Sequence, residues 1–169
     1  MKRAVLALSA LLLLLVGGCT VKYTLSGASI PPDAKTFSVA YFPNNAPMVA
    51  PILSATLTDE LTQRFATRTR LVQVPEGGDF AFEGEIVSYT STTSSVASGD
   101  YALQNRLTIT VKVNFTNAVD DKASFKARSF SAYADYDSTK LLTEVEGTLI
   151  PEIVDQLVTD IFMAAASNW

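Results

Sequence analysis

The run Leu107–Phe115 limits the fold most, because it alternates strictly between apolar and polar residues. Thr, Lys and Asn separate its apolar residues, which are Leu107, Ile109, Val111, Val113 and Phe115. Successive side chains of a strand point to opposite faces, so these apolar side chains share one face. We therefore predict a strand with one face in the core and the other face in solvent.

Other stretches predict further strands. Thr36–Phe42 is rich in aromatic and β-branched residues, and Leu71–Val74 is a short apolar stretch. Ser124–Tyr133 is more polar and follows a predicted turn, Asn117–Lys122. These stretches would lie beside the alternating strand in one sheet.

Asp79–Ile86 also alternates with period two. The pattern places Phe80, Phe82 and Ile86 on one face, and Glu83 and Glu85 on the opposite, solvated face. Ser and Thr dominate the next stretch, Ser88–Gly99, which fits either a flexible loop or the polar ends of a long hairpin.

Two stretches have helical periodicity. The first places an apolar residue at every fourth position: Leu53, Leu57, Leu61 and Phe65. The second fits a period of 3.6 with Leu149, Ile150, Ile153, Val154, Leu157, Val158, Ile161 and Phe162. Each helix thus has one apolar face, which we expect to pack on the sheet.

Thr143 and Glu146 have the spacing of a capping box before the second helix. Pro151 complicates this helix, because its ring would clash with the carbonyl of Gly147. Either the helix is kinked at Pro151, or its regular part begins near Thr148 with Pro151 in the first turn.

The order of these elements lacks the alternation of strands and helices that builds parallel sheets. We predict an α+β two-layer sandwich, with two helices on one face of a roughly four-stranded mixed or antiparallel sheet. Residues 36–169 would form this single domain.

The N-terminus has the pattern of a secretion signal. Lys2 and Arg3 precede an uncharged apolar run, Ala4–Val16, which is too short to span a membrane. Val16-Gly17-Gly18-Cys19 resembles a bacterial lipobox, in which residues 1–18 are removed and the sulfur of Cys19 receives a lipid. The alternative is an ordinary signal peptide that ends in a cysteine by chance.

A lipid on Cys19 would attach the domain to a membrane through residues 19–35, a tether with a Gly and a Pro-Pro pair. Two or more acyl chains suffice for stable anchoring. Thr20 stands where an aspartate retains such proteins in the inner membrane of well-studied bacteria with two membranes. We therefore expect the outer membrane, on its periplasmic side.

Composition excludes several function classes. The chain has 169 residues and a formal charge of −4, and it becomes more acidic once Lys2 and Arg3 are removed with the signal. An acidic domain is poorly suited to nucleic acid, whose phosphates bind basic surfaces. Cys19 is the single cysteine, so lipidation would leave no thiol for a disulfide.

The sequence also lacks the residues of common catalytic sites. It contains no histidine, which excludes the Ser-His-Asp and Cys-His arrangements and the usual zinc ligand sets. Gly77-Gly78 precedes a predicted strand, whereas a phosphate-binding loop precedes a helix. We predict no catalytic residue, no metal, no cofactor apart from the lipid on Cys19, and no enzymatic activity.

Two clusters of charged residues remain as candidates. Asp135 and Asp137 could be the paired carboxylates of a glycosidase or a Ca²⁺ site, but Asp and Ser here favour a turn and a helix cap. Arg64, Arg68 and Arg70 lie late in the first helix, where they form either a solvated rim or a contact for lipid phosphate.

The mature chain resembles the LPS-assembly lipoprotein family, also called LptE-like. The segments that carry this resemblance are Cys19 with its short tether, Phe37–Pro47, Phe82–Ile86, Leu107–Asn117, Ala134–Ser138 and the Ala-Ser-Asn-Trp end at Trp169. The resemblance implies two helices on a four-stranded sheet, in agreement with the fold expected from the patterns.

The resemblance also implies a function. Such proteins lie inside a large outer-membrane β-barrel, assist its assembly and help to pass lipopolysaccharide to the outer leaflet. Some members bind lipopolysaccharide through basic residues on the sheet side. The alternative is a free-standing periplasmic lipoprotein that binds a lipid or a glycan.

Overall fold

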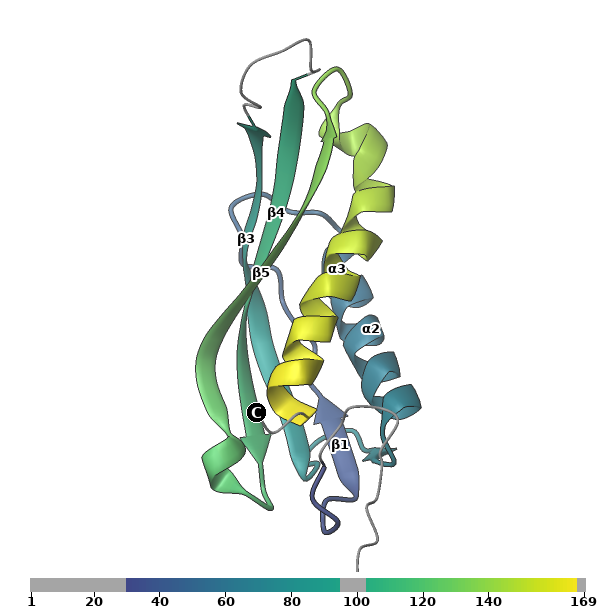
Figure 1. Cartoon of the computed structure of the whole chain (residues 1–169), viewed down its shortest axis with the longest axis vertical. Coiled ribbons are helices and arrows are strands. Elements are labelled where there is room, and N and C mark those ends of the chain that lie inside the picture. Colours follow the sequence, from purple (N-terminus) through teal and green to yellow (C-terminus); the bar gives the residue numbers. More distant parts are fainter. Residues whose placement is uncertain (1–29, 95–102, 167–169) are drawn as a thin grey trace, which may run out of the picture.

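The computed structural model describes residues 30–94 and 103–166. In this part of the chain, two helices pack on one face of a five-stranded mixed sheet (Figure 1). The predicted α+β class is confirmed, and the sheet has five strands where we expect roughly four. The signal and most of the tether lie outside the described residues.

The sheet has the strand order β2-β1-β3-β4-β5. Its strands are β1 (Thr36–Val39), β2 (Val72–Gln73), β3 (Phe80–Ser94), β4 (Gln104–Asn117) and β5 (Phe125–Asp137). β1 runs parallel to β2 and β3, whereas β3, β4 and β5 are antiparallel. A short 3₁₀ helix, η1 (Asp121–Ala123), lies in the predicted turn before β5.

β1 ends at Val39, before the predicted boundary at Phe42, although Ala40 still donates to Phe82 and Asn44 forms a parallel bridge with Ile86 of β3. Tyr41 then lies in solvent, while Phe42 turns into the core and is fully buried. Its ring occupies the space above Gly84: a Cβ built on Gly84 would lie 2.5 Å from Phe42 Cε1. A side chain at position 84 is therefore excluded by the backbone carbonyl oxygen of Lys112, which would be closer still, and by the Phe42 ring.

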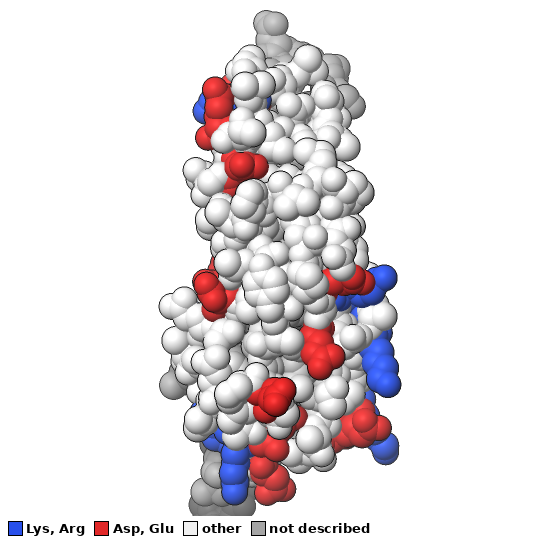
Figure 2. Space-filling view, turned by 180° about the vertical axis from the view of Figure 1, so that it is seen from behind, with Lys and Arg blue, Asp and Glu red and all other residues white. Residues whose placement is uncertain are grey.

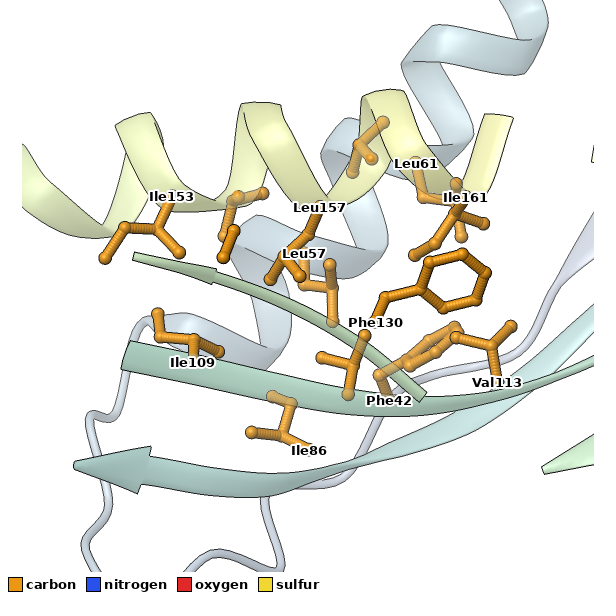
Figure 3. Close-up of a cluster of buried hydrophobic side chains, with 14 of the residues drawn as sticks. Phe42, Leu57, Leu61, Ile86, Ile109, Val113, Phe130, Ile153, Leu157 and Ile161 are labelled. Atoms are coloured by element: carbon orange, nitrogen blue, oxygen red, sulfur yellow. The ribbon is translucent and has the colours of Figure 1, made fainter. Parts of the chain in front are cut away.

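The helices are α2 (Leu53–Arg68) and α3 (Leu142–Ala166), and both cover the same face of the sheet. Every apolar residue that helical periodicity assigned to the core is buried. Figure 3 shows Leu57 and Leu61 of α2 and Ile153 and Leu157 of α3 converging on the strands. The helical period thus predicted both packing faces correctly.

The central strand β4 also follows its pattern. The five alternating side chains that we assign to the core are at most 1% exposed: Leu107, Ile109, Val111, Val113 and Phe115. Phe115 stacks on Phe82 at a centroid distance of 4.8 Å, and Phe82 lies 4.6 Å from Phe65 of α2. An aromatic cluster therefore joins the sheet to the helix layer.

The start of α3 differs from the prediction. The helix begins at Leu142 and runs continuously through Pro151, so it does not begin near Thr148. The predicted capping box of Thr143 and Glu146 is wrong, because the carboxylate of Glu144 accepts the hydrogen bond from the Leu141 backbone N–H at 2.9 Å.

β3 settles part of the ambiguity in the Ser/Thr stretch. Residues 88–94 are strand and pair with β4 up to Ser94 opposite Gln104, so the hairpin alternative is correct there. Residues 95–99 lie outside the described residues. The register shifts between Ile86 and Ser88, where Val87 is an extra residue in β3.

Candidate functional site

The sheet face that the helices leave open carries a group of side-chain hydroxyls. We call this group the hydroxyl face, and its residues are Ser88, Thr90, Thr92, Thr108, Thr110 and Ser131. They lie in cross-strand rows: Ser88 pairs with Thr110, and Thr110 pairs with Ser131. The face arises because the polar members of the alternating strands all point away from the core.

Two of these hydroxyls, from β4 and β5, are within hydrogen-bonding distance of each other. Thr110 Oγ1 and Ser131 Oγ are 3.0 Å apart, with either atom able to donate. Thr90, Thr92 and Ser131 are exposed, and Ser88, Thr108 and Thr110 are half-buried. The rows of Ser88 and Thr90 therefore offer donors and acceptors without ionised groups, whereas Thr92 lies in the row of Arg106.

One ion pair borders the hydroxyl face. Arg106 donates to both carboxylate oxygens of Asp135, at 2.7 Å from Nε and 2.9 Å from Nη2. Its guanidinium also lies 3.7 Å from the centroid of the Tyr133 ring. The hydrogen bonds from Arg106 hold the pKa of Asp135 below its usual range, so the pair stays ionised at neutral pH.

Charged side chains are unevenly distributed on one face of the molecule. On the face shown in Figure 2, acidic and basic side chains concentrate in the lower half, and the upper half carries few. The same upper end contains the last residues of β3 and the first residues of β4 in Figure 1. This face of the elongated domain is thus poor in charge toward that end.

The three predicted arginines do not form a common patch. Arg64 connects the helices: its Nη2 lies 2.6 Å from Asp155 and 3.3 Å from Glu60, and its Nη1 donates to Thr159. Arg70 donates to the backbone carbonyls of Ile30 and Pro31.

Arg68 is exposed, and its side chain forms no ion pair with the described residues. Two of the three arginines therefore have structural partners inside the domain. The contact with lipid phosphate stays a prediction.

Asp135 and Asp137 have different roles. Asp137 ends β5 and accepts hydrogen bonds from the backbone N–H and the hydroxyl of Thr139, as predicted for a turn. The placement of Asp135 in that turn is wrong, because Asp135 lies within β5 and pairs with Arg106. Neither aspartate caps α3. Across residues 30–94 and 103–166, no group of acidic, His or Cys residues is placed to hold a metal ion.

Sequence reasoning missed two polar contacts. Tyr89 is 2% exposed and donates through Oη to Glu146 of α3 at 3.0 Å. Asp79 accepts hydrogen bonds from the backbone N–H groups of Lys35 and Thr36. The sequence does carry a local signal for the Asp79 contact. Asp79 follows the turn residues Gly77-Gly78, and aspartates near turns often accept hydrogen bonds from backbone N–H groups.

The described helices include none that is long and apolar enough to cross a membrane. A family model described as lipopolysaccharide assembly, LptE, matches residues 34–165. The chain belongs to the LptE family. The match includes all the helices and strands of the domain except the last residue of α3.

Comparison with solved structures found similar chains of low sequence identity. Protein CT253 from Chlamydia trachomatis, described as hypothetical, is 12% identical with a TM-score of 0.50 and covers 76% of this chain and 93% of its own. A minor lipoprotein from Acinetobacter baumannii is 16% identical with a TM-score of 0.48, over 78% and 94% of the two chains.

An uncharacterized lipoprotein B from Nitrosomonas europaea is 11% identical, with a TM-score of 0.48 over 86% and 91% of the two chains. The likeness to CT253 shows a shared fold. No curated protein sequence matches the chain.

Family membership establishes a coarse function. The protein belongs to a family of lipopolysaccharide-assembly lipoproteins of the outer membrane. Members of this family are not enzymes, and they generally work with an outer-membrane β-barrel.

Proposed function

We propose that this LptE-family protein is the plug and assembly partner of an outer-membrane β-barrel that delivers lipopolysaccharide to the outer leaflet. The observation that carries the proposal is the hydroxyl face on the open side of the sheet, in a chain of this family. The proposal also includes a lipid anchor at Cys19.

The hydroxyl face suits the interior of a barrel. Lumens of large barrels are polar, and several are filled by a separate element. A buried charge without a partner costs several kcal/mol, whereas a hydroxyl finds a donor or an acceptor in most polar surroundings. The uncharged rows from Ser88 to Ser131 therefore contact a polar wall without requiring matched charges.

The position of the first described residues supports a defined orientation. The first described residues and β1 lie at the lower end of the molecule in Figure 1, and Arg70 holds Ile30 there. The ends of β3 and β4 lie at the opposite end. A domain anchored through Cys19 would thus extend the ends of β3 and β4 away from the lipid and into the lumen.

The direct experiment is a pull-down of the tagged full-length protein from detergent-solubilised outer membranes, followed by identification of the bound proteins. We expect recovery of a large barrel. Thr110→Lys should reduce this recovery, because it places a charge in the middle of the hydroxyl face. Thr67→Lys is the matched control, since Thr67 is exposed on α2, away from the sheet.

Depletion of the protein should lower the amount of barrel and leave lipopolysaccharide short of the cell surface. Recovery of the protein alone, with normal surface lipopolysaccharide after depletion, would contradict the proposal. That result would favour a free-standing lipoprotein that binds a lipid or a glycan.

A further inference from the structure

An apolar hollow lies where the chain between β1 and α2 meets the start of α3. We call it the α3 hollow, and its volume is about 420 Å³. The residues that line it are Met48, Val49, Tyr89, Leu141, Leu142, Thr143 and Glu146. They come from three segments that are far apart in the sequence, so the hollow exists only in the folded protein.

The rim of the hollow carries apolar side chains that lie in solvent. Met48, Val49 and Leu141 are 48%, 65% and 67% exposed. A single exposed apolar side chain is common on protein surfaces, whereas several of them around a concave surface are typical of a binding site. We therefore expect a partner to cover the α3 hollow.

The hollow also contains one acid. Glu146 is the only charged residue among the described residues that line it. Its carboxylate is half-buried, and Oε2 accepts the hydrogen bond from Tyr89 Oη at 3.0 Å. No other donor and no cation from the described residues reaches this carboxylate, so it can still accept hydrogen bonds from an incoming group.

This combination of surfaces limits the chemistry of the occupant. An acyl chain or an aliphatic side chain would cover the apolar rim, but it would also remove water from the Glu146 carboxylate without replacing it. A phosphate or a second carboxylate would be repelled by Glu146. An arginine side chain fits both parts, because its methylene stem packs on apolar surface while its guanidinium donates to a carboxylate.

We propose that the α3 hollow is the docking site for an arginine side chain of the barrel partner. The stem of this arginine packs against Met48, Val49 and Leu141, and its guanidinium pairs with Glu146. The first turns of α3 lie in the upper half of Figure 1, away from β1. The assignment rests on the function proposed above, in which this end extends into the lumen, and it adds a contact outside the hydroxyl face.

The first test uses small probes on the purified full-length protein in detergent, without a partner. The methyl groups of its methionines are isotope-labelled and followed by NMR while butylguanidinium is added at millimolar concentration. We expect the Met48 signal to shift, and to shift at least about fivefold less with the neutral analogue butylurea, because the charge of Glu146 favours a cation. Met163, in the last turns of α3, is the internal control.

Glu146→Gln should abolish the preference of the Met48 signal for the cationic probe. Equal shifts with both probes in the wild type would overturn the proposal and favour an apolar occupant. The absence of a Met48 shift with butylguanidinium would also overturn it.

The second test compares variants in the pull-down from solubilised outer membranes. Glu146→Gln should lower the recovery of the barrel at least about threefold, because the amide still accepts from Tyr89 but carries no charge for a guanidinium. Glu152→Gln is the matched control, since Glu152 is exposed on the same helix. Full recovery with folded Glu146→Gln would overturn this proposal alone, whereas the absence of a barrel with the wild type would contradict the proposed function itself.

The third test identifies the occupant directly. A photo-cross-linking amino acid replaces Val49, and mass spectrometry of the cross-linked peptides should find a barrel segment that contains an arginine. The same replacement at Val72 is the control, because Val72 is equally exposed on β2 and lies outside the hollow. A barrel that is recovered but cross-links to position 49 through no arginine-containing segment would overturn the proposal.

Discussion

Tyr89 Oη lies 3.0 Å from Glu146 Oε2, which joins the middle of β3 to the first turns of α3. The Tyr89 ring is buried, while Glu146 lies at the rim of the core. Burial, together with the neighbouring Glu146 carboxylate, raises the pKa of Tyr89 above its usual value, so the phenol remains a donor at neutral pH. This contact fixes the N-terminal part of α3 on the sheet.

Tyr89→Phe should therefore lower the free energy of unfolding by about 1 kcal/mol, the usual value of one such hydrogen bond. Urea denaturation followed by circular dichroism measures this effect. Tyr133→Phe is the matched control, because Tyr133 is 49% exposed and should change stability little. Equal losses of unfolding free energy in the two variants would contradict a stabilising role of the Tyr89–Glu146 hydrogen bond.

Val111→Asp should lower the free energy of unfolding by several kcal/mol, because Val111 is fully buried in β4 and the new carboxylate would have no partner. Thr110→Asp places the same charge on the neighbouring residue, which points to the open face. Its effect on unfolding in urea should be much smaller. A comparable loss at position 110 in the purified protein would contradict the assignment of the two faces.

Ala127→Gly should raise the free energy of unfolding by up to about 1 kcal/mol. Ala127 has a φ of 50°, a conformation that is unfavourable for residues with a Cβ and accessible to glycine. Ala132→Gly in the same strand should instead destabilise the protein, since Ala132 is buried in a regular pair. Thermal unfolding of both variants distinguishes relief of strain from a general effect of glycine.

Acid should weaken the attachment of β1. The backbone N–H groups of Lys35 and Thr36 and the Thr36 hydroxyl donate to Asp79 and hold its pKa below the ordinary value of 3.8. Because the folded-state pKa is the lower one, the unfolded state takes up the proton first. The stabilisation is fully present above a pH of about 3.8, and it is lost as the pH falls through the folded-state pKa of Asp79.

Asp79→Asn removes this titration. The difference in free energy of unfolding between the wild type and the variant should therefore shrink as the pH falls through that range. A difference that stays constant over the same pH series would contradict the role of the Asp79 carboxylate. The comparison cancels the titrations of Asp135 and Asp137, whose pKa values are also lowered.

Cys19→Ala should block lipidation and processing, because the thiol is the nucleophile that takes the lipid. We expect a larger precursor in the inner membrane fraction. Mass spectrometry of the wild type should find an acylated Cys19 at the N-terminus. An unmodified Cys19 would contradict both the anchor and the outer-membrane location.

The sequence by itself determined the fold class and the core. Hydrophobic periodicity is a local property, so the buried face of β4 follows from its alternation and that of α3 from its period of 3.6. Leu107 of β4 and Phe162 of α3, for example, are both buried as these patterns predicted. The turn at Asp137 was also predictable, because an aspartate binds the backbone two residues later.

The tertiary structure decided the remaining features, which are the burial of Tyr89, the ion pairs and the hydroxyl face. The physical reason differs from one feature to the next. The extra residue Val87 reverses the alternation of β3 and brings Tyr89 into the core, and such a bulge exists only relative to the partner strand β4.

Asp135 is paired with Arg106, and Arg64 with Asp155, by contacts between segments far apart in the sequence. The hydroxyl face likewise depends on which strands are neighbours. Local patterns set which side of each element is apolar, while the order and register of the strands set which polar residues meet.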